Sequence, residues 1–254
     1  MSEQETFISH LIELRDRILR ALIAFAVVFV CLFPFAQDLY TLVAGPMLAA
    51  LPKGKEMLAT GVASPFFIPV KVTMMCAFVV ALPIILYQVW AFVAPGLYAH
   101  EKKLIAPLVV SSTALFLCGM AFAYFLVLPT VFRFLASFTP EGVSFAPDIS
   151  QYLDFVLTLL IAFGLAFEVP VVVVVLVRMG VVSVEKLKEI RPYVIVGAFV
   201  IGAIFTPPDV ISQLMLAIPM WLLYELGIIV AGMLGRRAAQ QESLDDAPGA
   251  GGGT

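Results

Sequence analysis

Long apolar runs limit what this chain can fold into more than any other feature. A bilayer core of about 30 Å is crossed by about 20 apolar residues in a helix, because backbone groups in lipid must be hydrogen-bonded internally. Six stretches meet or approach this length, at 18–37, 67–97, 104–132, 153–178, 192–207 and 210–234. Of all residues, 62% are hydrophobic and 13% are charged, against about 25% charged in soluble domains. The sequence therefore predicts an all-α, polytopic membrane protein with six transmembrane helices.

The fifth and sixth spans are shorter than the others. Only 17 uncharged residues separate Arg191 from Asp209, and 15 separate Asp209 from Glu225. Pro207 and Pro208 end the fifth helix, so the two spans form a tight hairpin. Spans this short are accommodated by tilt or by local thinning of the bilayer. Counting the hairpin as one segment would give five spans.

The distribution of basic residues predicts the orientation. If the amino terminus is cytoplasmic, eleven Lys and Arg residues face the cytoplasm and four, Lys53, Lys55, Lys71 and Arg133, face outward. The excess agrees with the positive-inside rule. An odd number of spans would move Arg236 away from the other cytoplasmic charges, which favours six spans with both termini in the cytoplasm.

The membrane domain, 18–235, is expected between two polar ends. Residues 1–17 have near-helical spacing of apolar side chains, which predicts an amphipathic segment at the cytoplasmic interface. Residues 236–254 are polar and then Gly-rich, which predicts a disordered cytoplasmic tail. Prolines within several spans predict kinked helices. There is no internal repeat of the kind found in many secondary transporters.

Six short segments, spread from the first span to the last, resemble signature segments of the TatC family of twin-arginine translocase subunits. They are His10–Arg15, Ala63–Phe67, Leu86–Phe92, Phe167–Pro170, Arg191–Tyr193 and Thr206–Asp209. Their order and spacing match the family over nearly the whole chain. The resemblance implies a cupped protein of the bacterial cytoplasmic (inner) membrane that binds twin-arginine signal peptides together with TatB. It also implies TatA assembly for export of folded proteins, and a homo-oligomer within a TatBC complex.

Two carboxylates on the cytoplasmic rim are candidates for signal-peptide binding. Glu13 and Glu101 can receive the two guanidinium groups through charge-assisted bonds, and the resemblance adds Phe92 to this site. Arg15 and Arg17 belong to the same rim, where they offer the carboxylates a competing partner. The simpler alternatives are an i,i+4 pair of Glu13 with Arg17 and a favourable helix-dipole position for Glu101.

Glu168 lies inside the fourth span, where a carboxylate is costly and seldom faces lipid. Counting about 1.5 Å per residue places it roughly 15 Å deep, level with Gln88 on the second span. These two residues predict a polar cavity within the membrane. A hydrogen-bonded network that only fixes helix packing is the alternative.

The external end of the hairpin carries the remaining candidates. Thr206 and Gln213 are candidates for docking partner helices of TatB or TatA, with intramolecular packing as the alternative. Pro46 and Asp209 match family positions in an external cap. Asp209 could also cap the sixth helix.

Enzyme chemistry is not indicated. The sequence has two histidines, both predicted on the cytoplasmic rim, and no HExxH, GxSxG or intramembrane Asp pair. We expect no cofactor, no metal and no nucleic-acid partner, with the lipid bilayer as the surroundings. A secondary transporter or channel that uses the buried acid is the competing function.

Overall fold

The described part of the chain is helical. The computed structural model describes residues 3–50, 58–93, 105–137, 148–205 and 210–245, and no strand occurs among them. The helical elements are α1 (Glu3–Leu32), η1 (Phe33–Phe35), α2 (Ala36–Ala50), α3 (Ser64–Val93), α4 (Ile105–Phe122), η4 (Ala123–Val127), α5 (Leu128–Ser137), α6 (Ile149–Phe167), α7 (Val169–Arg178), α8 (Val184–Glu189), α9 (Arg191–Phe205) and α10 (Val210–Asp245). The predicted all-α class is confirmed.

Five helical segments in the described ranges are long and apolar enough to cross a membrane, and α9 adds a shorter one over Arg191–Ile204. Several successive helices share one span. Pro34 lies at the start of η1, between α1 and α2, where its missing N–H leaves no bond unmade. A π-helical turn, η4, joins α4 to α5. These joints are the bends that the prolines and the long apolar stretches predict.

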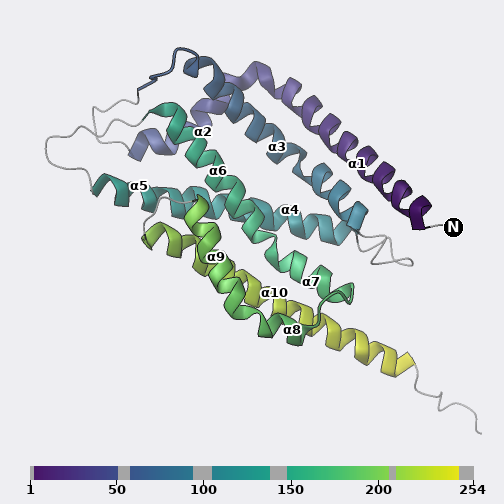
Figure 1. The fold of residues 1–254 in the computed structure, drawn as a ribbon. Helices are drawn as coiled ribbons and strands as arrows, with labels where there is room; N and C mark the ends of the chain where they lie inside the picture. The colour runs from purple at the N-terminus through teal and green to yellow at the C-terminus, as the bar shows by residue number, and fades with distance from the viewer. Residues whose placement is uncertain (1–2, 51–57, 94–104, 138–147, 206–209, 246–254) are drawn as a thin grey trace, which may run out of the picture.

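The helices lie side by side in an open bundle (Figure 1). α1 runs antiparallel to α3, α4 packs on α3 and α6, and α10 lies along α7 and α9. The start of α1 and the end of α10 are at the same end of the molecule, at the right of Figure 1. α1 passes residue 17 without a break, and α10 continues to Asp245, past the boundary at 235 that the hydropathy predicts.

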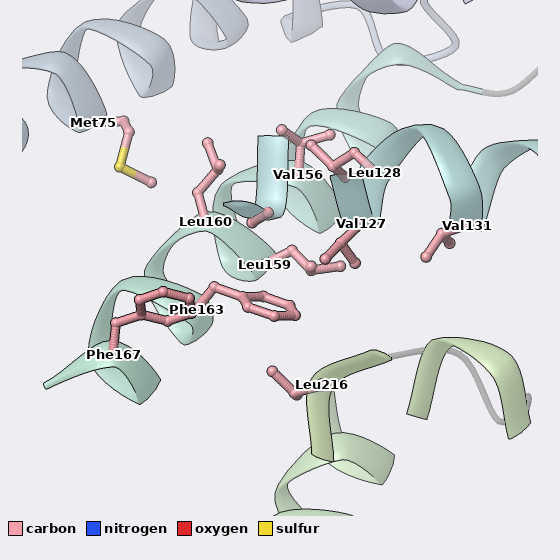
Figure 2. Packing of buried hydrophobic residues seen from close by; sticks show 11 residues of the cluster. Met75, Val127, Leu128, Val131, Val156, Leu159, Leu160, Phe163, Phe167 and Leu216 are labelled. Carbon is pink, nitrogen blue, oxygen red and sulfur yellow. The ribbon is translucent and has the colours of Figure 1, made fainter. Parts of the chain in front are cut away.

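The main core lies where α6 meets η4, α5 and α10. Figure 2 shows its buried side chains, among which Met75 extends from α3 toward Leu160 on α6. Here α4 and α6 touch through backbone, because a Cβ added at Gly119 would lie 2.4 Å from the carbonyl oxygen of Phe163 and 2.9 Å from Cγ of Phe167. Small residues at contacts of this kind let transmembrane helices approach closely.

Hydrogen bonds tie the segment before α3 to the start of α6. Asp148 caps α6 by accepting from the backbone N–H groups of Ser150 and Gln151, and it also accepts from the N–H and hydroxyl of Thr60. The hydrogen bonds from Thr60 are the main reason that the pKa of Asp148 falls from 3.8 to about 2. The Ile149 N–H donates to the Leu58 carbonyl at 3.0 Å. This end of the molecule is the one predicted to face outward.

Candidate functional site

An aromatic contact joins the start of α1 to the end of α3. The rings of His10 and Phe92 stack with centroids 4.5 Å apart. The residues are far apart in sequence, and the sequence pattern did not predict the pair. Because Glu13 lies one helical turn beyond His10, the contact brings the α1 carboxylate and the candidate residue Phe92 to the same end of the bundle.

The charged side chains on α1 are paired locally. Glu13 accepts from Nε and Nη2 of Arg17 at 2.9 and 2.5 Å, so the simple i,i+4 pair exists. The Glu13 side chain keeps 37% of its surface exposed and Arg17 keeps 19%. Arg15 instead binds its neighbour Asp16, at 2.8 Å, and is largely exposed. The second candidate carboxylate, Glu101, lies outside the described residues.

Glu168 occupies the break between α6 and α7. The helix stops there because Pro170, at the beginning of α7, has no N–H to continue the ladder. α7 then restarts with a bond from the Val172 N–H to the Glu168 carbonyl at 3.0 Å. The Glu168 residue is 8% exposed, so the structure places the acid within protein as its membrane depth predicts.

Unpaired oxygen atoms distinguish this region. Neither carboxylate oxygen of Glu168 has a hydrogen-bond partner within the described part of the chain, and the same holds for Oε1 of Gln88. The Ser112 hydroxyl lies near Glu168 and accepts a bond from the Trp90 indole N–H at 2.8 Å. Buried acceptors without donors are costly, and the Ser112 hydroxyl is close enough to the Glu168 carboxyl to donate to it.

The hairpin of α9 and α10 is closed by polar contacts. Nε2 of Gln213 donates to the Phe199 carbonyl at 2.9 Å, so one amide hydrogen is used within the chain. Arg191 and Glu225 form an ion pair at 2.6 Å across the hairpin. The Tyr224 hydroxyl donates to the Leu187 carbonyl of α8 at 2.8 Å.

The side chains of three further candidate residues are not described by the structure. Thr206 and Asp209 lie outside the described residues, and Pro46 lies within α2, where side chains beyond Ala44 are not described. Among the residues that are described, no group of three or more His, Cys, Asp and Glu side chains could hold a metal ion.

Comparison with known proteins agrees with these features. The family model of the Sec-independent protein translocase protein (TatC) matches residues 9–219. The Escherichia coli (strain K12) protein TatC is 56% identical over 230 residues, covering 90% of this chain and 89% of that protein. TatC of Azotobacter chroococcum mcd 1 is 54% identical and covers 95% of this chain and 94% of its own. TatC of Aquifex aeolicus (strain VF5) is 41% identical and covers 90% of this chain and 95% of its own length.

Solved structures show the same fold. A crystal structure of the twin-arginine translocase receptor TatC matches with a TM-score of 0.75 and 42% identity, over 88% of this chain and 98% of that one. A second crystal structure, of the receptor TatC in DDM, matches with a TM-score of 0.78 and 41% identity. The match covers 87% of this chain and 99% of that one. The predicted fold of six spans with a short fifth is confirmed. The sixth span was also predicted to be short, but it covers 23 residues, Gln213–Gly235, because the apolar helix continues past Glu225. Since the family model covers most of the chain and these relatives match over nearly their whole lengths, the chain belongs to the TatC family, as a multi-pass receptor subunit of the twin-arginine translocase and not an enzyme.

Proposed function

We propose that this chain binds twin-arginine signal peptides at the rim formed by Glu13, Glu101 and Phe92. The observation that carries the proposal is the stacking of His10 on Phe92. It joins the carboxylate-bearing face of α1 to the end of α3, and Glu101 follows Phe92 by nine residues in the sequence. Two carboxylates on adjoining segments suit two adjacent guanidinium groups.

The existing ion pair is compatible with this role. Arg17 holds the Glu13 carboxylate in a geometry that already binds a guanidinium, and a peptide arginine exchanges with it. Arg15, bound to Asp16, lies on the same rim and favours signal peptides whose flanking charges are not basic.

Cross-linking of a photoreactive twin-arginine peptide to the full-length protein in membranes tests the site. Glu13→Gln and Glu101→Gln should each reduce the adduct, and the double variant should remove it. A twin-lysine peptide should cross-link weakly throughout, because Lys cannot form the bidentate bond. Glu189→Gln is the matched control, since Glu189 is an exposed acid paired with Lys186 on α8. Unchanged cross-linking in the double variant would exclude these carboxylates from the site.

We also propose that both termini face the cytoplasm, in the bacterial inner membrane. The eleven-to-four distribution of basic residues supports this orientation, as does the common position of the start of α1 and the end of α10 in Figure 1. Reporter fusions at the two ends should give cytoplasmic activity for both. Periplasmic activity at either end would contradict the orientation.

The polar cavity is proposed to receive part of the transported peptide. Support comes from the burial of Glu168 and from Oε1 of Gln88, which has no hydrogen-bond partner within the described part of the chain. Both side chains can accept bonds from backbone N–H groups or from water entering between the helices. Glu168→Gln keeps the shape and one acceptor, whereas Glu168→Ala removes the group. Export of a folded reporter should therefore fall further with alanine than with glutamine. Full export by the alanine variant, with a cysteine at 168 inaccessible to water-soluble reagents, would contradict the cavity.

Partner helices of TatB and TatA are proposed to dock on the short hairpin. One face of α9 is exposed and apolar, with Val196, Val200 and Ile204 at 62%, 54% and 71% exposure. Their spacing of four residues makes a continuous stripe for another helix. We expect Gln213 and Thr206 to supply interhelical hydrogen bonds at the external end of the hairpin, and Pro46 and Asp209 to belong to an external cap. Disulfide cross-linking from position 200 to TatB should succeed, and cross-linking from position 110 on α4 should fail.

A further inference from the structure

A cavity lies between the bent first span and the middle of the bundle. It measures about 420 Å³ and is bordered by the end of α1 and by α2, α3, α4, η4 and α6, with Val43, Cys76, Val79 and Leu160 in its wall. Its described lining is apolar, and the lining Tyr124 turns its hydroxyl to the Val43 carbonyl. The π-helical turn η4 contributes both Tyr124 and Phe125. Turns of this kind are frequent at functional sites.

The cavity opens toward lipid. Val80 and Phe125 line it and are 59% and 75% exposed, and both lie within apolar membrane spans. A methylene group takes about the same volume as a water molecule in the liquid, ~30 Å³. A cavity of about 420 Å³ therefore holds about 14 methylene groups, which is most of one fatty acyl chain. A helix about 10 Å wide with a 5.4 Å pitch would fill the same volume with a single turn.

Two charged residues lie close in the sequence to lining residues on α3 and α6. Lys71 precedes the lining residue Val72, and Asp154 lies one helical turn before the lining residue Leu157. Their ion pair, with Nζ and Oδ1 2.6 Å apart, remains exposed, at 42% for Lys71 and 53% for Asp154. An ammonium beside a carboxylate complements the phosphate and ammonium of a zwitterionic headgroup.

We propose that the cavity binds one acyl chain of a bilayer phospholipid, with its phosphate against Lys71. Lipid tails are as apolar as the side chains that line the wall, so the hydrophobic effect alone does not favour the site. The gain comes from dispersion contacts with the cavity wall and from the charge-assisted bond to the headgroup. The site goes beyond the proposed receptor function and does not rest on it.

Photoreactive lipid tests the proposal. The full chain is placed in membranes containing phosphatidylethanolamine with a diazirine in one acyl chain, and adducts are mapped by mass spectrometry. Adducts should concentrate on 72–80 of α3 and 157–160 of α6, with one phospholipid retained per chain after solubilisation in detergent. Adducts spread evenly over all exposed spans, or no retained phospholipid, would overturn the proposal.

Two substitutions on one helix provide the matched comparison. Ala121 lines the cavity and is exposed, so Ala121→Trp fills the space without disturbing the core. Ala114 is also exposed on α4 and does not line the cavity. Ala121→Trp should lower adduct formation several-fold and Ala114→Trp should leave it unchanged; equal adducts in both would refute the site. Should Ala121→Trp fail to fold, Ala121→Leu makes the same comparison.

The headgroup contact has its own test. Lys71→Gln should reduce retained phospholipid, and Lys71→Arg should keep it, because arginine preserves the charge. Retention that is equal in the glutamine and arginine variants would overturn the assignment of the phosphate to Lys71.

Discussion

Replacing Gly119 by alanine tests the contact that positions the buried acid. A Cβ there would lie 2.4 Å from the Phe163 carbonyl oxygen and 2.9 Å from Phe167 Cγ. Backbone cannot rotate away as a side chain can, so α4 and α6 must separate by about 1 Å to reach an ordinary contact distance. Phe167 directly precedes Glu168, and the separation therefore moves the acid away from Ser112.

The expected loss of stability in Gly119→Ala follows from the cost of overpacking. Forcing extra atoms into a packed contact costs about 1–3 kcal/mol, while alanine recovers up to about 1 kcal/mol of helix propensity over glycine. Gly232→Ala on α10 isolates the propensity, because nothing lies within 4 Å of a Cβ at Gly232. The difference between the two variants should be about 1–3 kcal/mol, which corresponds to a Tm gap of roughly 2–12 °C for a chain of this size.

Thermal unfolding in detergent, followed by the fluorescence of Trp90 and Trp221, measures this gap. Gly119→Ala should unfold at the lower temperature, and Gly232→Ala should unfold at or above the wild-type temperature. Equal Tm values for the two variants would refute the close helix contact as a source of stability.

Three further predictions concern individual polar contacts. The Asp148 pKa of about 2 lies below its usual 3.8. The contribution of Asp148 to stability is therefore complete above pH 3.8 and is lost as pH falls toward 2. The difference in Tm between pH 5 and pH 2.5 should be larger in wild type than in Asp148→Asn. Ser112→Ala should lower the free energy of unfolding more than Trp90→Phe, because it leaves the buried indole N–H unpaired, as denaturant titration can measure. Glu225→Gln and Arg191→Gln should each destabilise the hairpin, with the double variant costing less than the sum of the singles in a double-mutant cycle.

The helices could be predicted because lipid permits little else. Apolar length alone located every span, including the short α9. Helix ends outside the membrane are not constrained in that way. α10 continues over 238–245, where Ala, Gln, Glu and Leu favour helix although hydropathy has already fallen. Polarity therefore marked where the membrane domain ends and did not mark where the helix ends.

The candidate site was predictable only in part. Pro170 signals the break beside Glu168, and the cost of a carboxylate in lipid signals its burial. The sequence gives no such signal for two side chains that meet from different helices. Nothing in the sequence pairs His10 with Phe92 or Trp90 with Ser112, because each pair depends on the rotation of two helices about their own axes. Gln213 shows the same limit, since its bond to the Phe199 carbonyl depends on how tightly the hairpin closes.

The hydrogen bonds between Thr60 and Asp148 also set an order for biogenesis. Thr60 donates to a carboxylate 88 residues later in the chain. When the ribosome has delivered the first two spans to the insertion machinery, Asp148 has not been synthesised, so the loop between them has no anchor. These bonds form only after the third span is in place and the start of the fourth has been synthesised, so the contact between Thr60 and Asp148 is a late step of folding.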